Sequence, residues 1–206
     1  MQTAFDQFEN NMSYVKELDS LHIYLTDVQM LPNDFSDILR AEWIYSVSAL
    51  DKLIHELLRI GMMETFRGSR TPTPKFLSFT ISVATLNNIK ISTGTSIPPA
   101  EYYFEQEIVK KHSYLSFQEP DKINEGLSLI WAHNYKWQHL ARETGITPEE
   151  TLKTRLKTII SRRNQMVHEA DINPTTGRRS DITKADADSV VAFIELLAKK
   201  IFESVK

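Results

Sequence analysis

The 206-residue sequence contains no cysteine, which excludes thiol nucleophiles, disulfide bonds and zinc sites built on cysteine. Any reaction of this protein must therefore use histidine, carboxylate, hydroxyl, arginine or lysine side chains. The chain also lacks a G-x-G-x-x-G pattern and a Walker lysine loop, so nucleotide hydrolysis has no support. The stretch HELLR, which begins at His55, has no second histidine and is not a zinc-protease motif.

Long apolar runs are missing as well. No run of 18 apolar residues is present that could span a bilayer, and the first 20 residues lack the basic start and apolar middle of a signal peptide. We therefore expect a cytoplasmic protein without a membrane partner. The formal net charge of −3 argues against a protein that coats nucleic acid with its whole surface, but it leaves room for a local basic patch.

The composition is that of an ordinary globular protein, with 41% hydrophobic and 25% charged residues. We expect a single domain over residues 1–206. Apolar side chains recur at three- and four-residue spacing over much of the chain, which predicts an all-α fold. The first two helices are predicted at residues 4–29, ended by Pro32, and from Asn33 or Asp34 to Phe66, ended by Gly68 and the TPTP turn.

The middle of the chain is also predicted to be helical. Residues 75–92 are rich in β-branched side chains, but no second strand is available to pair with them, so a helix is expected there. Residues 92–99 are predicted to form a loop. Two further helical runs are expected at residues 100–117 and 120–145, the second opened by Pro120 and closed by Gly145.

Capping signals mark the last two predicted helices. Thr147, Pro148 and Glu150 have the pattern of a capping box, with Thr147 as N-cap residue and Pro148 at the first helical position. Asn173, Pro174 and Gly177 are expected to break this helix. Thr183 and Asp186 open a last amphipathic helix that runs to the C-terminus.

The helix that begins after Thr147 carries an unusual arginine. On a helical wheel of residues 148–170, Arg163 falls near the centre of the apolar stripe. Asn164 and His168, four residues apart, share one flank with Lys153 and Lys157, whereas Arg155 and Arg162 lie on the other flank. The apolar stripe consists of Leu152, Leu156, Ile159, Ile160, Met166 and Val167.

A buried guanidinium needs a partner, because an uncompensated buried charge costs several kcal/mol. The second helix offers a polar row at the edge of its apolar face, formed by Ser48, Asp51 and His55. If the two helices pack together, either Asp51 or a bound phosphate would satisfy Arg163. The sequence alone leaves both alternatives open.

The residues Arg163-Asn164-x-x-x-His168, near the C-terminus of an all-α chain, resemble the Arg-x(4–6)-His signature of the HEPN superfamily. The stretches RRNQMVHEADINPTTGRRSDIT and SVSALDKLIHELLRIGM look like the RiboL-PSP-HEPN subgroup, whereas residues 75–145 match only as helical segments. The resemblance implies a HEPN-like antiparallel helical bundle with an extra helical insertion in the middle of the chain. Similar proteins are commonly metal-independent endoribonucleases, often toxins or effectors of phage defence, and they form homodimers.

Carried over to this chain, the resemblance implies that Arg163, Asn164 and His168 are catalytic. The chemistry suits these residues, because histidine can accept or release a proton at neutral pH and arginine can hold a phosphate and its developing charge. RNA supplies the 2′-OH as nucleophile, and the products would be a 2′,3′-cyclic phosphate and a 5′-hydroxyl. No cofactor or metal is expected. A second histidine from a symmetry mate would provide both a base and an acid.

Further residues are expected around this site. Asp51, His55, Arg162 and Glu169 are expected to support the catalytic residues. Alternatively, Asp51 and His55 belong to an ordinary polar edge of their helix, and Glu169 is a solvated acid at the end of its helix. Acids such as Glu169 and Asp171 are unfavourable at a helix C-terminus, which hints at a purpose. The expected track for the RNA backbone consists of Lys153, Arg155, Lys157, Arg178 and Arg179. An antitoxin or sensor protein is a possible further partner.

One alternative function stays open. Arg163 and His168 would be a structural core arginine and a surface histidine if the protein were a non-catalytic helical module that binds a nucleotide, an RNA or another protein. The ring-rich stretch WAHNYKWQH at residues 131–139 is expected to pack in the core. His133 and His139, six residues apart, are not expected to share a face as metal ligands.

Overall fold

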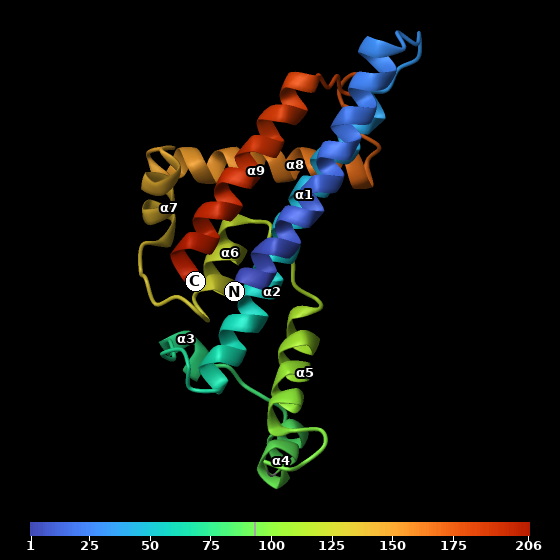
Figure 1. The fold of residues 1–206 in the computed structure, drawn as a ribbon. Helices are drawn as coiled ribbons and strands as arrows, with labels where there is room; N and C mark the ends of the chain where they lie inside the picture. The colour runs from blue at the N-terminus through green and yellow to red at the C-terminus, as the bar shows by residue number, and fades with distance from the viewer. Residues whose placement is uncertain (93) are drawn as a thin grey trace.

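Three long helices form the body of the protein in the computed structural model, which describes residues 1–92 and 94–206. They are α1 (Gln2–Ile23), α2 (Ser36–Phe66) and α9 (Lys184–Val205), and α1 runs antiparallel to the other two (Figure 1). A short π-helical segment, η1 (Tyr24–Val28), extends α1. The described residues contain no β-strand, only one isolated bridge between Ile172 and Arg179, so the predicted all-α class is confirmed.

The amphipathic pattern of α1 explains why these helices pack together. The helix buries Ala4, Phe8, Met12 and Val15, which recur every three or four residues and so lie on one face. The longer α2 is central and buries residues along nearly its whole length, since it contacts helices on several sides. The two ends of the chain pack against each other, and the rings of Phe5 and Phe202 stack there with their centroids 4.5 Å apart.

Helix α8 (Glu149–His168) crosses this body behind α1 and α9, and α7 (Lys136–Thr144) lies at its N-terminal end (Figure 1). The crossing with α2 is held by a buried hydrogen bond in which Trp43 Nε1 donates to the carbonyl oxygen of Ile159 at 3.0 Å. The two helices that carried the functional hypothesis are therefore packed against each other.

The middle of the chain forms the predicted helical insertion. It contains α3 (Pro74–Leu77), α4 (Val83–Ile91), α5 (Ala100–His112) and α6 (Pro120–Leu127). Helices α4 and α5 extend away from the body (Figure 1), whereas α6 packs against α2. The helical prediction for 75–92 is right only in part, because residues 78–82 interrupt it. Residue 93, within the predicted 92–99 loop, lies outside the described residues.

Other predicted bounds need correction. The run at 100–117 ends as a helix at His112, and the run at 120–145 is two helices separated by residues 128–135. Helix α6 ends where the backbone N–H groups of Leu129, Ile130 and Trp131 donate hydrogen bonds to carbonyl oxygens of its last turn. This non-helical segment buries Leu129 and Ile130 in the core, so tertiary packing overrides the continuous helical pattern.

The two capping predictions have opposite outcomes. Helix α8 begins at Glu149, with Pro148 as an extended N-cap residue and no side-chain cap from Thr147, so the first prediction is wrong. The ψ of 173° at Pro148 places that residue before the helix. The capping box of α9 is confirmed, because Thr183 and Asp186 exchange side-chain-to-backbone hydrogen bonds.

Among the described residues, no helix is both long enough and apolar enough to cross a membrane.

Candidate functional site

The C-terminal half of α8 carries the residues of the hypothesis. Five of the six predicted stripe residues are buried, namely Leu152, Leu156, Ile159, Ile160 and Met166. Val167 is the exception and is 44% exposed. Helix α8 ends at the next residue, and its last turn extends beyond the core. Arg163 lies in the middle of this stripe but is half-buried, because the space beside it is open.

A hollow of about 630 Å³ lies beside Arg163. Ile160, Arg163 and Asn164 of α8 line it on one side, and Asp51 of α2 lies on another. The lining is completed by Lys122 of α6 and by the segment between α5 and α6, which contributes Tyr114, Leu115, Ser116, Gln118 and Glu119. The structure therefore brings together Asp51, Arg163 and Asn164.

The guanidinium of Arg163 has few protein partners. Its Nη1 donates to Oδ1 of Asn164 at 3.2 Å, and its buried Nε has no partner among the described residues. The ion pair with Asp51 that the helical wheel suggested is not formed. Asp51 instead accepts hydrogen bonds from the backbone N–H of Phe117 at 2.6 Å and from Nε2 of Gln118 at 3.3 Å. The carboxylate thus holds the loop that lines the hollow and leaves the arginine unpaired.

His55 supports the same loop from one turn further along α2. Its Nε2 lies 3.8 Å from Oδ1 of Asp51, and its ring meets the edge of Phe117 with centroids 4.7 Å apart. His112 of α5 also touches Phe117, and burial lowers the pKa of His112 to about 4, so this ring is neutral. The predicted supports Asp51 and His55 therefore act on the loop and not on Arg163.

His168 is the last residue of α8 and is exposed, as is Glu169 after it. His168 lies one turn after Asn164 on the same flank of the helix. It is not part of the lining of the hollow, and its side chain has no hydrogen-bond partner among the described residues. The imidazole is therefore open to a ligand from solvent, beside the hollow that holds the arginine.

The chain reverses sharply after this histidine. Ala170 and Asp171 have φ angles of 51° and 58°, in the left-handed region that residues with a side chain rarely adopt. The Asp171 side chain is fully buried, and its Oδ2 accepts hydrogen bonds from Arg40 Nε at 2.8 Å and from Arg162 Nη2 at 3.2 Å. Two ion pairs stabilise this strained reversal, because a buried carboxylate needs charged partners.

The two arginines also bind the chain beyond the turn. Arg40 Nη2 donates to the carbonyl oxygen of Ser180 at 2.8 Å, and Arg162 Nη2 donates to that of Asp181 at 2.7 Å. We call this set, Arg40, Arg162 and Asp171, the arginine clamp. Arg162 thus belongs to the clamp on the flank opposite Asn164, and sequence reasoning missed Arg40. The sequence does contain a signal for Arg40, because this arginine adjoins the apolar row of α2 and an acid, Asp171, follows the end of α8.

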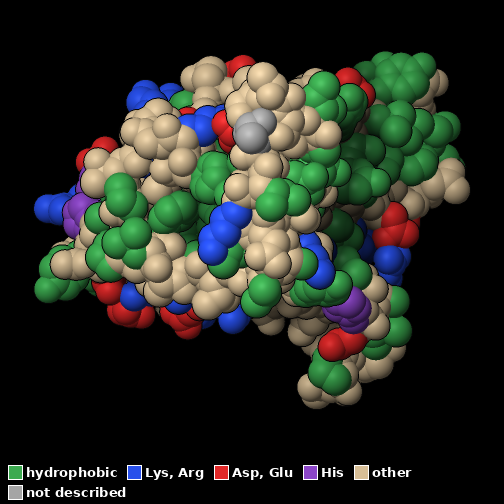
Figure 2. Space-filling model, turned by 90° about the horizontal axis from the view of Figure 1, so that it is seen from below, with side chains coloured by type: hydrophobic (Ala, Val, Ile, Leu, Met, Phe, Trp, Pro, Cys, Tyr) green, Lys and Arg blue, Asp and Glu red, His purple; other side chains and the backbone are tan. Residues whose placement is uncertain are grey.

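The predicted basic track is only partly available. Lys153 binds Glu149 at 2.9 Å, and this hydrogen bond raises the pKa of the lysine. Arg155 binds Ser189 and covers the ring of Phe193 on α9. Arg179 pairs with Asp37 at 2.6 Å. On the face drawn in Figure 2, Lys and Arg side chains are scattered and do not form one continuous stripe.

Lys157 and Arg178 remain as exposed cations without an acidic partner among the described residues. Together with Arg163, these two cations are therefore available, among the described residues, to contact the phosphates of a nucleic-acid backbone.

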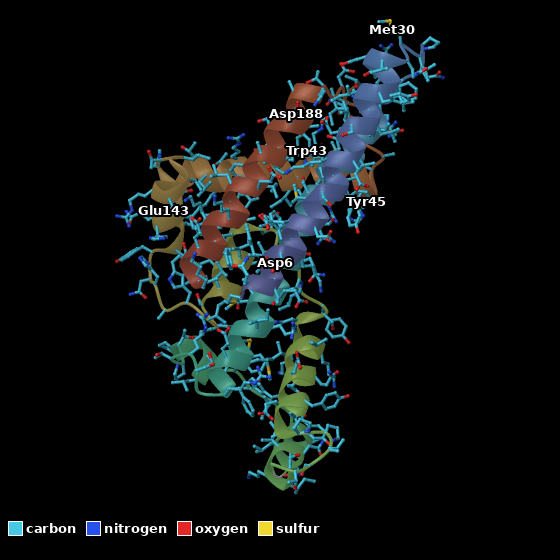
Figure 3. All side chains as sticks on the ribbon, in the orientation of Figure 1. Asp6, Met30, Trp43, Tyr45, Glu143 and Asp188 are labelled. Atoms are coloured by element: carbon cyan, nitrogen blue, oxygen red, sulfur yellow. The ribbon has the colours of Figure 1, made fainter. Side chains whose placement is uncertain are left out.

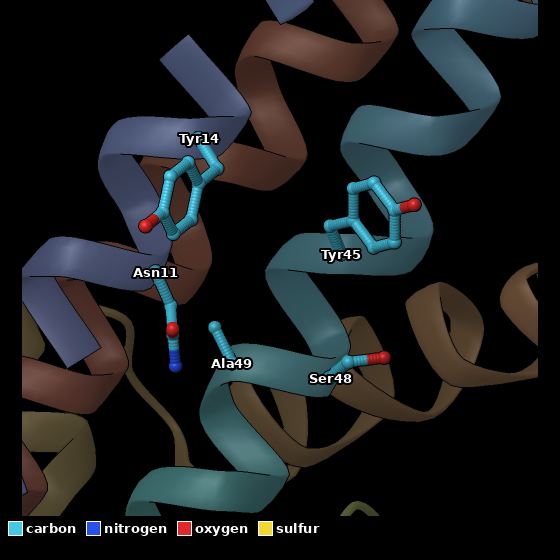
Figure 4. Close-up of a pocket in the computed structure, with 5 residues that line it drawn as sticks. All are labelled: Asn11, Tyr14, Tyr45, Ser48 and Ala49. Atoms are coloured by element: carbon cyan, nitrogen blue, oxygen red, sulfur yellow. The ribbon is translucent and has the colours of Figure 1, made fainter. Parts of the chain in front are cut away.

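A second, more apolar groove of about 430 Å³ lies between α1 and α2. Tyr14 of α1 and Tyr45 of α2 are about half exposed on its two sides, and Asn11 of α1 and Ala49 of α2 lie below the two rings (Figure 4). Ser48 of the same groove lies three residues before Asp51 on α2, so the groove is adjacent along the helix to the hollow beside Arg163.

The ring-rich segment at 131–139 packs in the core only in part, because Lys136 and Trp137 are its only buried residues and Tyr135 is 69% exposed. Trp137 is buried, as expected, but His133 and His139 do meet, with ring centroids 5.4 Å apart. The interruption after α6 brings His133 back over α7, which helical spacing could not foresee. His133 Nδ1 accepts the N–H of Tyr135 and His139 Nε2 bonds Ser204, so both rings already have protein partners.

One comparison with known proteins gave a match. The family model described as RiboL-PSP-HEPN matches residues 9–206, and thus nearly the whole chain. No curated protein and no solved structure matched the chain.

Proposed function

The chain belongs to the RiboL-PSP-HEPN family, and from that premise we propose that it is a metal-independent endoribonuclease. The observation that carries the proposal is Arg163, a half-buried arginine without a carboxylate partner among the described residues, beside an open hollow and five residues before an exposed histidine. A structural arginine in this position would be expected to hold a protein acid, as Arg40 does. A phosphate is the partner that this guanidinium lacks.

In the proposed reaction, Arg163 binds the scissile phosphate and stabilises the negative charge of the pentacoordinate state. His168 takes the proton of the 2′-OH, whose oxygen attacks the phosphorus, and the bond to the 5′-oxygen breaks. The products are a 2′,3′-cyclic phosphate and a 5′-hydroxyl. Asn164 orients the guanidinium through its 3.2 Å hydrogen bond.

A second copy of the chain would supply the missing proton donor. Each chain has only one histidine in this motif, and a base and an acid are both needed for efficient cleavage. We therefore propose a homodimer in which the two C-terminal ends of α8 face one cleft. The exposed Val167, next to His168, and the tyrosine groove on the adjacent part of α2 are the apolar surfaces available for this contact.

The RNA backbone is proposed to follow Arg163, Lys157 and Arg178, because these cations have no acidic partner to displace in the part of the chain that the structure describes. Asp51 and His55 shape the hollow through the loop at Phe117 and do not take part in proton transfer. A role as a toxin or phage-defence effector, restrained by an antitoxin or sensor protein, is supported by the family alone.

The proposal is tested with His168→Ala and Arg163→Ala, each assayed on a mixed RNA pool in EDTA. Both variants should lose cleavage by about 10²-fold or more while they remain folded, because one removes the proton carrier and the other the phosphate ligand. His133→Gln, at the opposite end of α8 beside α7, is the matched control and should cleave like wild type. Full activity of either motif variant would end the proposal.

A non-catalytic nucleotide- or RNA-binding module is the second candidate, and one observation favours it. His168 is not among the residues that line the hollow of Arg163, so a phosphate bound there need not meet the imidazole. In that case Arg163→Ala would abolish salt-dependent RNA binding, whereas the wild type would leave the RNA uncut with or without a divalent ion.

A further inference from the structure

Three acidic residues meet at the end of the bundle that is remote from the chain termini. Asp19 of α1, Glu42 of α2 and Asp188 of α9 each place a carboxylate oxygen within 4.8 Å of the other two. Asp188 lies near the start of α9, above Trp43, the neighbour of Glu42 (Figure 3). The cluster thus joins the three long helices of the body.

Glu42 is the unusual member of this cluster. It is only 1% exposed, and its buried Oε1 has no hydrogen-bond partner among the described residues. Burial, together with the charge of Asp19, raises the pKa of Glu42 to about 7. The carboxylate of Glu42 thus forms no ion pair among the described residues, and its neighbours in the cluster are two further acids.

Lys184 compensates only part of this charge. Its Nζ lies 2.6 Å from Oδ1 of Asp19 and 2.8 Å from Oδ1 of Asp188, but no ion pair joins it to Glu42 among the described residues. The ammonium carries one positive charge against three carboxylates. Lys184 is the first residue of α9 and its side chain is 34% exposed, so it can turn outward into water without disturbing the core.

We propose that Asp19, Glu42 and Asp188 bind a calcium-sized divalent cation, which replaces the ammonium of Lys184. Calcium takes carboxylate oxygens at about 2.3–2.6 Å, so ligands on opposite sides of one ion lie up to about 5 Å apart, as in this cluster. Two of the three acids reach the surface, and water can complete the coordination there. Carboxylates without histidine favour calcium over zinc.

The cation would fasten α1 to α2 and α9 and would take no part in RNA cleavage. Calcium should therefore raise the thermal stability of the protein, since a ligand that binds only the folded chain stabilises it. Removal of calcium should leave nuclease activity intact. This inference and the proposed function can thus fail separately.

The test is calorimetric titration of the EDTA-treated and desalted full-length protein with CaCl₂, together with its Tm. We expect one saturable site and a Tm that rises with CaCl₂. Glu42→Gln keeps the volume and removes the charge, and it should weaken binding by at least about tenfold. Glu195→Gln, which removes an acid of α9 that pairs with Lys16, is the matched control and should bind like wild type.

A second variant tests the role of the lysine. Lys184→Met removes the competing ammonium and should tighten calcium binding, although it weakens the protein without calcium. Absence of binding heat and of any Tm shift in the wild type at millimolar CaCl₂ would overturn the proposal. It would also be overturned if Glu42→Gln bound calcium as the wild type does, or if Lys184→Met weakened binding.

Discussion

At the residue scale, two kinds of arginine stand side by side on α8. Arg162 and Arg40 share the buried carboxylate of Asp171, and their remaining donors reach carbonyl oxygens. Arg163, one residue later, has only an amide oxygen on its own helix as a partner among the described residues. Arg162 and Arg40 thus stabilise the fold, whereas Arg163 keeps hydrogen-bond donors that a ligand can use. This difference could not be read from the sequence, because it depends on which acid each side chain reaches.

The arginine clamp makes a stability prediction. Arg40→Ala leaves Asp171 buried with only Arg162 as a partner, so the free energy of unfolding should fall by about 3 kcal/mol. Urea titration measures this loss. Arg179→Ala, which removes the exposed pair with Asp37, is the control and should cost less than about 1 kcal/mol. Equal effects of the two substitutions would contradict the role of the clamp.

Glu42 makes a prediction about pH. Its pKa rises from 4.5 to about 7 on folding, so the folded state holds this proton more tightly and loses stability as pH rises between these values. Glu42→Gln removes that loss. In EDTA, the variant should match wild type below pH 4.5 and exceed it by about 3 kcal/mol at about pH 8.

The difference between the two proteins isolates Glu42 and its neighbours Asp19, Asp188 and Lys184. It removes the opposite contribution of His112, whose lowered pKa favours folding as pH rises. Unfolding curves at several pH values give the comparison. A difference that does not change with pH would show that Glu42 has no raised pKa.

At the element scale, helices with a single apolar face were predictable and interrupted segments were not. The start of α9 at Thr183 and Asp186 and the end of α2 at Phe66 follow from local capping and periodicity. The break between α6 and α7 does not, because Leu129 and Ile130 leave the helix in order to enter the core. The end of α8 was also predicted too late, since the buried side chain of Asp171 stops the helix before Asn173 is reached.

The packing of α6 sets the loop beside Arg163. A Cβ on Gly126 would lie 2.8 Å from Cε1 of Phe117 and 2.9 Å from Cδ1 of Leu58, too close for either buried ring or side chain. Gly126→Ala should therefore cost about 1 to 3 kcal/mol of stability and displace the loop held by Asp51. Thermal unfolding and RNA binding measure the two effects. Gly94→Ala, where nothing lies within 4 Å, is the control and should change neither.

At the scale of the whole molecule, the family and its all-helical architecture could be predicted from the residues at 162–183 and along α2, because these carry the motif and its packing surface. The site could be predicted only in part. Arg163 and Asn164 line a hollow, but Asp51 acts on a loop, and the expected basic track is reduced to fewer free cations. Partners of long side chains come from distant segments, and spacing along one helix does not specify them.

The proposed dimer makes a prediction about mixed assemblies. A heterodimer of one wild-type subunit and one His168→Ala subunit, isolated by two different tags, has one histidine in the shared cleft. Because base and acid must both be present, its activity should fall far below half that of the wild-type dimer. Activity at half the wild-type value would show that each chain cleaves RNA on its own.

The most direct measurement of the central claim is the analysis of RNA termini after incubation with the purified wild-type protein in EDTA. We expect fragments with 2′,3′-cyclic phosphate and 5′-hydroxyl ends, none from a DNA strand of the same sequence, and none from the Arg163→Ala or His168→Ala variants. Intact RNA under these conditions, or fragments with 5′-phosphate ends that require a divalent ion, would contradict it.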